Sequence, residues 1–183
     1  KTDILNMLQQ YLYPTLAQYK DIIARPGIDY HSIQQQLIPI LEDVQSNGDE
    51  ALIRYTKLFE KVSLHTFKVS QIEMDDATLQ VAPSLREAIH HAAANIHKFH
   101  LRQQQDLLPE ETTEGVFCWR KNIAIEAVGL YIPGGTAPLF STVMMLALPA
   151  RIAGCQRRIL CTPPNSEGKI HPAILYAAQH CGI

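Results

Sequence analysis

The stretch Val128-Gly-Leu-Tyr-Ile-Pro-Gly-Gly-Thr-Ala-Pro138 decides the fold of this chain. Alternating apolar residues precede it (Ile123, Ile125 and Ala127), and a long apolar segment follows it, Leu139–Ala153. The alternation predicts a strand, and the longer segment predicts a helix. Glycine gives the Pro-Gly-Gly turn conformational freedom, and a turn ahead of a helix N-terminus is suited to holding an anion such as a pyrophosphate. Pro-Gly-Gly also occurs in ordinary turns, and neither G-x-G-x-x-G nor G-x-x-x-x-G-K-[ST] is present, so the turn alone leaves its ligand open.

The segment after this turn continues with a second strand and a second helix. Arg158–Thr162 is an apolar run bounded by Pro163-Pro164, which is typical of a strand, and Ile170–His180 has the pattern of a helix. Strand, helix, strand and helix in this order form a βαβα unit, about half of a nucleotide-binding α/β domain. The sequence therefore predicts an α/β fold.

The chain before residue 60 is predicted to be helical. Apolar spacing indicates a helical segment over 3–24, with a new start at Pro14, and then helices over 32–46 and 49–59. Gly48 is the natural stop between the last two.

Capping boxes and short strands follow. Ser70-x-x-Glu73 and Ser84-x-x-Glu87 each predict the start of a helix, and the second helix should end near Leu107. A short strand is expected over 64–69. After an acidic loop at 110–114, two extended stretches, 116–120 and 123–132, are expected to pair across Lys121-Asn122.

Composition excludes several classes of protein. The chain has 183 residues, 46% of them hydrophobic, and a formal net charge of −2. No dense basic run indicates a nucleic-acid partner, and the longest apolar run, 139–153, is too short to span a membrane. The opening Lys1-Thr2-Asp3 shows no signal peptide. The four cysteines form no C-x-x-C pair, a pattern that fits a reducing cytoplasm.

Neither a metal site nor a catalytic group is predicted from the residue types. Four of the eight histidines lie on the predicted helix after residue 84, but no H-E-x-x-H arrangement accompanies them, so we expect solvent-exposed side chains there and on His171 and His180. Cys155 and Cys161 have no sequence-local base or cation to activate them, and we expect core thiols. Glu126 could serve as a base, although an outward-facing strand position is the simpler expectation.

Tyr131 is the strongest candidate for a binding residue. Alternation along the strand places it on the opposite face from Leu130 and Ile132, immediately before the turn, and ligands of open α/β sheets bind beyond the carboxyl ends of strands. A tyrosine there can stack on a ring and still offer its hydroxyl. A packed core tyrosine remains the alternative. Pro133 and Gly134 shape the same rim, and Thr162-Pro163-Pro164 ends the next strand on the same edge.

Several strings, taken together, resemble the histidinol dehydrogenase family. They are Val128–Gly135, Ala137–Val143, Pro149–Cys155, and, further upstream, Arg25-Pro26, Gly48–Leu52 with Tyr55 and Phe59, Lys68–Ser70, and Asn95-Ile96 with Phe99-His100, all in the family's order. Within this resemblance Tyr131 matches the family's tyrosine that contacts NAD. His100 matches a family histidine for which a structural hydrogen bond is expected.

The resemblance implies a cytoplasmic, zinc-dependent homodimer that oxidises L-histidinol through the aldehyde to L-histidine by two hydride transfers to NAD. It also implies an α/β fold similar to aldehyde dehydrogenases, with incomplete Rossmann-like α/β/α units. Residues 1–24 would be an N-terminal helical segment, 25–130 the first part of α/β domain one, and 131–183 the first part of the NAD-binding domain. The cofactor-binding residues would then be Tyr131, Pro133 and Gly134.

The resemblance covers only the family's N-terminal portion, so the chain is expected to be truncated. The family's Glu-His pair and its zinc ligands (Gln, His, Asp and His) match no residue here, and no catalytic or metal-binding residue is assigned. We therefore expect the 183-residue chain to be inactive alone, and its open sheet edges to favour a dimer or a swapped assembly. A non-catalytic binding or assembly module on the same scaffold is the alternative. A different aldehyde-dehydrogenase-like oxidoreductase is disfavoured by the Tyr131–Gly135 string.

Overall fold

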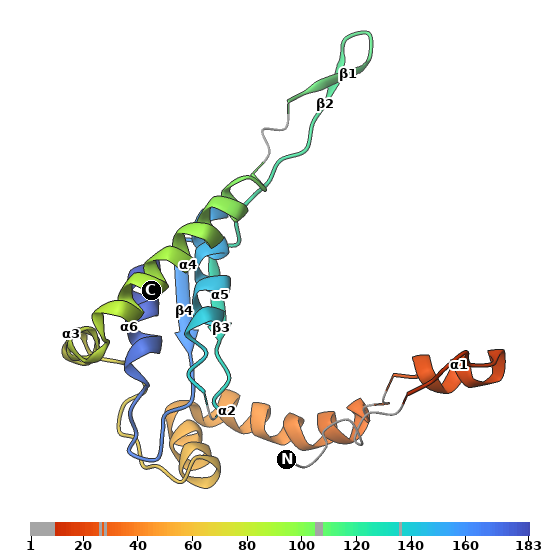
Figure 1. The fold of residues 1–183 in the computed structure, drawn as a ribbon. Helices are drawn as coiled ribbons and strands as arrows, with labels where there is room; N and C mark the ends of the chain where they lie inside the picture. The colour runs from red at the N-terminus through yellow and green to blue at the C-terminus, as the bar shows by residue number, and fades with distance from the viewer. Residues whose placement is uncertain (1–9, 26, 28, 105–107, 136) are drawn as a thin grey trace. The chain divides into compact units, whose positions relative to one another are not determined.

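The computed structural model describes residues 10–25, 27, 29–104, 108–135 and 137–183. The residues divide into two compact units, up to Gly48 and from Asp49 onward. Figure 1 shows the elements, which in chain order are α1 (Leu16–Ile23), α2 (Tyr30–Phe59), α3 (Gln71–Gln80), α4 (Pro83–Leu101), β1 (Glu110–Thr113), β2 (Val116–Cys118), β3 (Ala127–Tyr131), α5 (Phe140–Ile152), β4 (Arg157–Cys161) and α6 (Pro172–Cys181). Every helix in these ranges is too short or too polar to cross a bilayer.

The first unit contains α1 and most of α2. Of the helix predicted over 3–24, α1 accounts for 16–23, residues 10–15 are not helical, and 1–9 lie outside the described residues. The predicted stop at Gly48 is confirmed, because this glycine has φ 53° and ψ −130°, angles that no α-helix contains. The helical backbone therefore breaks there, although hydrogen bonding continues α2 to Phe59.

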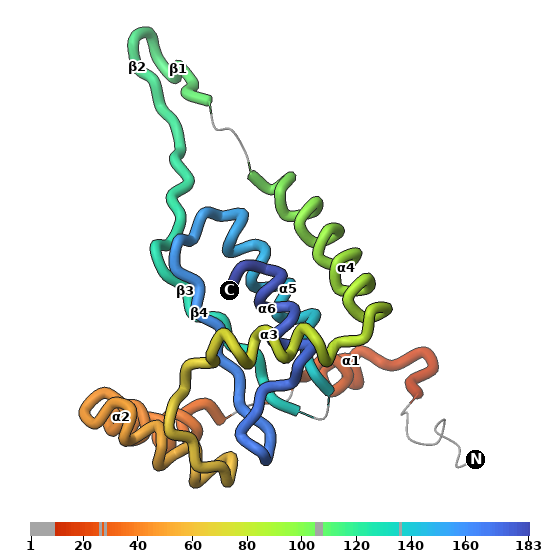
Figure 2. The backbone as a smooth tube through the Cα atoms, turned by 90° about the vertical axis from the view of Figure 1, so that its left-hand side faces the viewer, coloured from red at the N-terminus to blue at the C-terminus, as the bar shows by residue number. Residues whose placement is uncertain are grey.

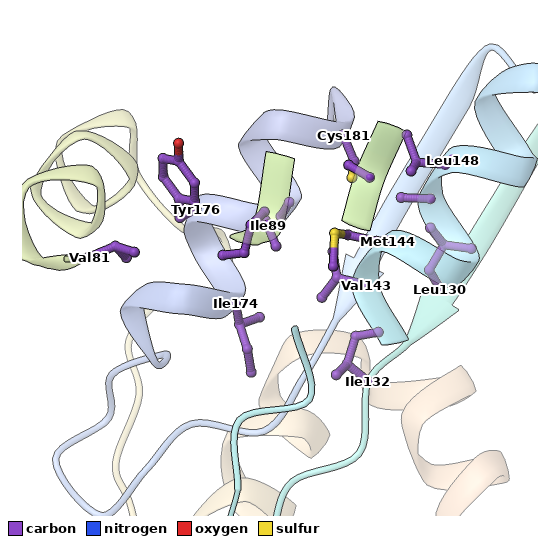
Figure 3. Close-up of a cluster of buried hydrophobic side chains, with 14 residues drawn as sticks. Val81, Ile89, Leu130, Ile132, Val143, Met144, Leu148, Ile174, Tyr176 and Cys181 are labelled. Atoms are coloured by element: carbon purple, nitrogen blue, oxygen red, sulfur yellow. The ribbon is translucent and has the colours of Figure 1, made fainter. Parts of the chain in front are cut away.

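The second unit is built on the predicted βαβα segment. Strands β3 and β4 are parallel neighbours, with Leu130 opposite Leu160 and Tyr131 opposite Cys161. Helices α4, α5 and α6 contribute buried side chains to one core together with the inward face of β3 (Figure 3). The largest fully buried side chains of this core are Ile89, Ile132, Val143, Met144 and Cys181. The α/β class is thus confirmed.

The predicted pairing of 116–120 with 123–132 is wrong. Strand β2 instead pairs antiparallel with β1, which forms from the acidic stretch that was expected to be a loop. Gly115, with φ 78°, closes this hairpin, and its N–H donates to the Glu111 carboxylate at 2.7 Å. Lys121-Asn122 offers no such glycine. Figures 1 and 2 show the hairpin extending away from α4, α5 and α6.

One of the two predicted capping boxes is confirmed. The Ser70 N–H and hydroxyl donate to the Glu73 carboxylate at 2.8 and 2.9 Å, and the Glu73 N–H donates back to Ser70 Oγ. Ser84 caps nothing, because α4 already starts at Pro83, whose fixed φ suits the first helical position.

Two further predictions differ from the structure. Helix α4 ends at Leu101, well before residue 107, and the Gln104 side chain then donates to the Ile152 carbonyl at 2.6 Å. The strand predicted over 64–69 is absent, since these described residues are irregular. Val62 and Leu64 instead lie against Gly168, where an added Cβ would come within 3.2 Å of both.

Candidate functional site

The candidate site lies at the carboxyl edge of the β3–β4 sheet. Tyr131 closes β3 and is 64% exposed, whereas its neighbours Leu130 and Ile132 are 6% and 0% exposed. The predicted alternation is therefore confirmed, and Tyr131 is not packed in the core of this chain. The Ile132 N–H donates to the Cys161 carbonyl at 2.9 Å, so the backbone at the rim stays tied to β4.

The face of the sheet that carries Tyr131 is open and partly apolar. Gly129 shares this face two residues earlier, and an added Cβ there would meet nothing within 4 Å. On β4 the register partners of these two residues are Ile159 and Cys161, both exposed. A flat ring could therefore lie against Tyr131 without meeting a side chain at position 129.

The two turns beyond the strands touch each other. An added Cβ at Gly134 would lie 2.7 Å from Pro163 Cγ, which is closer than carbon atoms normally approach. Glycine at 134 is thus required for this contact, and it fixes the turn after β3 against the turn after β4. Thr136 lies outside the described residues.

A hollow of about 480 Å³ opens beside these turns. Its walls come from both turns, from α3 and from the start of α6. The site residues predicted from the sequence that line it are Pro133, Gly134, Thr162, Pro163 and Pro164. Tyr131 belongs to the adjoining open face of the sheet and does not line the hollow. The structure therefore brings together the two predicted segments, the turn after β3 and the residues that end β4.

The wall that α3 supplies was missed by sequence reasoning, because no motif marks it. Glu73 and Asp76, one turn apart on α3, line the hollow together with Lys169. Hydrogen bonds from the Ser70 N–H and hydroxyl lower the pKa of Glu73, so this carboxylate stays ionised at neutral pH. An anion is therefore disfavoured at the α3 wall. The start of α5 suits an anion better, because its N-cap residue, Leu139, offers no side-chain hydrogen bond to the first-turn N–H groups.

The histidines occupy several different environments. His171 Nδ1 accepts a hydrogen bond from the Ala173 N–H at 3.1 Å and caps α6, and His100 is hydrogen-bonded to Gln103. His90, His91 and His180 are exposed, as expected, whereas His97 and His100 are half-buried, so the expectation is wrong for those two. The rings of His90 and His180 also stack on each other. Within the described ranges, no group of three or more His, Cys, Asp or Glu side chains could hold a metal ion.

The cysteines fall into two pairs. Cys155 and Cys181 are buried, and burial raises the pKa of the Cys181 thiol to about 11. Cys118 and Cys161 are exposed, so the expectation of a core thiol is wrong for Cys161. Glu126 is exposed just before β3.

Comparison with known proteins agrees with this architecture. The model of the histidinol dehydrogenase family matches residues 23–183. The chain belongs to this family. It is 45% identical over 171 residues to histidinol dehydrogenase from Bacteroides fragilis, covering 93% of this chain and 40% of that protein. It is 41% identical to the one from Buchnera aphidicola subsp. Melaphis rhois, covering 92% of this chain and 83% of that protein.

A solved structure matches as well. The crystal structure of histidinol dehydrogenase from Elizabethkingia anophelis superposes with a TM-score of 0.90 at 47% identity, covering 94% of this chain and 40% of that one. The family resemblance read from the sequence is thus confirmed. The chain spans about 40% of the length of the Bacteroides and Elizabethkingia proteins.

Proposed function

We propose that this chain forms the N-terminal part of a histidinol dehydrogenase that oxidises L-histidinol through histidinal to L-histidine with NAD. The observation that carries the proposal is the strand–turn–helix unit β3–α5, in a chain of this family, with Tyr131 exposed at the strand's carboxyl end. Ligands of open α/β sheets typically bind just beyond the carboxyl ends of the strands.

The cofactor-binding residues in this proposal are Tyr131, Pro133 and Gly134. NAD would supply the hydride acceptor when bound. The Tyr131 ring would stack on a planar group of NAD. Because Gly129 has no side chain, there is room for that group on this face of the sheet. Pro133 and Gly134 would form the rim, held in place by the contact between Gly134 and Pro163.

Zinc dependence is also proposed, on the family resemblance alone. The described residues offer no ligand set for a zinc ion. By the family resemblance, the ligands (a Gln, two His and an Asp) would belong to the part of the family's sequence that this chain does not span.

The same proposal covers the wider organisation. It includes an architecture similar to aldehyde dehydrogenases, a cytoplasmic homodimer, and the assignment of 1–24, 25–130 and 131–183 to a helical segment, a first domain and an NAD-binding domain. It also includes the absence of dehydrogenase activity from the 183-residue chain, because hydride transfer needs acid–base groups that the cofactor does not supply.

Titration of the purified chain with NAD tests the proposed cofactor site at Tyr131, Pro133 and Gly134. Tyr131→Ala should weaken binding by about 5- to 160-fold, the range expected when one stacked aromatic ring is removed. Tyr30→Ala, at an exposed tyrosine of α2, is the matched control and should change nothing. Equal effects of both substitutions would contradict the assignment.

Turnover is measured separately, as NADH formation from L-histidinol with added zinc. NADH produced by the 183-residue chain would overturn its predicted inactivity. Intact mass and the DNA sequence after codon 183 would show whether a longer protein contains the chain, and that protein should then oxidise histidinol.

The alternative is a non-catalytic binding or assembly module on the same scaffold. One observation favours it: large apolar side chains on α1 and α2, among them Leu16, Ile23 and Leu41, are exposed. Surfaces of this kind are typical of protein–protein contacts. Sedimentation analysis that shows a defined oligomer without NAD binding would support this alternative.

A further inference from the structure

Two histidine rings meet between helices α4 and α6. The centroids of His90 on α4 and His180 on α6 are 4.3 Å apart, and their planes differ by 14°. His90 also stacks on Tyr176, and its Nε2 atom is hydrogen-bonded to the Tyr176 hydroxyl at 2.7 Å. Figure 3 shows Tyr176 on α6 beside the core. These contacts join helices that are far apart in sequence.

The charged groups nearest this cluster are mostly cationic. The Arg86 guanidinium of α4 lies 5.9 Å from the centroid of the Tyr176 ring. Arg151 of α5 acts electrostatically on both His180 and Cys181, and Arg158 of β4 donates to the Gly182 carbonyl at 2.9 Å.

The carboxylates of the packed helices are all on α3 and α4. Helix α3 meets the end of α6 through a neutral hydrogen bond, from the Thr78 hydroxyl to the Gln179 side chain at 2.9 Å. The α3 carboxylates of Glu73 and Asp76 line the hollow at the start of α6. Glu87 is exposed on α4, one turn before His90. Glu87 can balance a positive charge on His90, but helix α6 carries no carboxylate that would balance one on His180, and two charged rings would still repel each other.

We propose that His90, His180 and Tyr176 form a pH-sensitive latch that holds α4 against α6 while both imidazoles are neutral and weakens when they are protonated. The hydrogen bond to Tyr176 can persist in either state, because Nε2 can accept or donate. The stack cannot, because two imidazolium rings 4.3 Å apart repel each other. Ile174 and Leu175 of α6 line the hollow, so loosening α6 would alter that wall.

The direction of the pH effect follows from the environment of His180. Although the His180 side chain is exposed, its partial burial lowers its pKa, and the charges of His90 and Arg151 act in the same direction. The unfolded chain takes up this proton near pH 6.5, whereas the folded chain takes it up at lower pH. The stabilising contribution is therefore complete above about pH 6.5 and is lost as the pH falls from there through the folded-state pKa.

A double-mutant cycle at two pH values tests the latch. The proteins are the wild type, His90→Ala, His180→Ala and the double variant, unfolded in urea at pH 8 and at pH 5. At pH 8 the pair should contribute about two- to twelvefold to the folding equilibrium constant, the range for aromatic pairs. At pH 5 this coupling should be smaller than at pH 8, because protonation introduces repulsion between the two rings. His91→Ala, at an exposed histidine of the same helix, is the control and should leave the pH dependence unchanged.

NMR titration of the histidine rings gives an independent readout. His90→Phe, which keeps a stacked ring but removes the titrating group, should raise the pKa of His180 toward its ordinary value, whereas a merely packing role of His90 would leave that pKa unchanged. Equal coupling at both pH values, no coupling at either, or a His180 titration that is the same with and without His90 would each overturn the latch.

Discussion

Replacing Gly134 with alanine should force apart the two turns at the carboxyl edge of the sheet. The new Cβ would lie 2.7 Å from Pro163 Cγ, 3.7 Å from Cβ and 3.8 Å from Cδ. Carbon atoms in contact are normally about 3.5–4.0 Å apart, so the turns must separate by roughly 1 Å. Overpacking of this kind costs about 1–3 kcal/mol, which corresponds to a fall in Tm of roughly 3–10 °C for a chain of this size. NAD binding should weaken too, if the proposed rim is correct.

The neighbouring glycine provides the matched control. Neither Gly134 nor Gly135 has a positive φ, so alanine fits the backbone at both, but a Cβ at 135 meets nothing within 4 Å. Gly135→Ala should therefore change stability by less than about 0.5 kcal/mol. Circular dichroism during urea unfolding measures both. Pro163→Ala removes the clashing Cγ, so it should relieve most of the loss when combined with Gly134→Ala. Equal losses at 134 and 135, or no rescue by Pro163→Ala, would refute the reasoning.

Three further predictions concern stability and thiol reactivity. Ser70→Ala should cost about 1 kcal/mol by removing the N-cap of α3, and Ser84→Ala should cost little, as thermal unfolding of both variants will show. The contribution of the Ser70–Glu73 pair should be complete above the unfolded pKa of the carboxyl and be lost as the pH falls through its lowered folded value. Ile132→Ala, at a fully buried position, should cost about 2–5 kcal/mol in urea unfolding, and Ile159→Ala, 45% exposed, much less. Alkylation followed by mass spectrometry should label the exposed thiols of Cys118 and Cys161 quickly and the buried thiols of Cys155 and Cys181 only on unfolding. Protection of Cys161 in the folded chain would contradict the open face beside Tyr131.

The sequence predicted the elements whose signals are local. The order of β3, α5, β4 and α6 follows from apolar periodicity interrupted by turn residues, and the exposure of Tyr131 follows from simple alternation. The break at Gly48 and the Ser70 cap also depend on neighbouring residues only. In each case the deciding interaction spans no more than a few positions.

The errors concern choices that distant residues decide. The strand predicted over 64–69 has the right composition, but no described strand pairs with it, and Leu64 instead packs near Gly168. Val116–Cys118 found a partner upstream because Gly115 permits a tight hairpin there. The β-propensity of a segment does not determine which other segment it pairs with. The hollow depends on α3 reaching the two turns, so its acidic wall could not be predicted from motifs.

The candidate cofactor edge depends on few parts of the chain. The hydrogen bond from Ile132 to the Cys161 carbonyl, the register of Tyr131 with Cys161, and the contact between Gly134 and Pro163 all lie between residues 127 and 163. Since these contacts need nothing from the first unit, the edge should keep its shape when residues 1–48 are removed. NAD binding and catalysis would then be separable. The proposed NAD site is formed by residues close together in sequence, whereas the acid–base groups and metal ligands would have to come from other parts of the protein. A chain that binds NAD without turnover, and still binds it after that deletion, would fit this division. Loss of binding on deletion would show that the edge depends on the N-terminal unit.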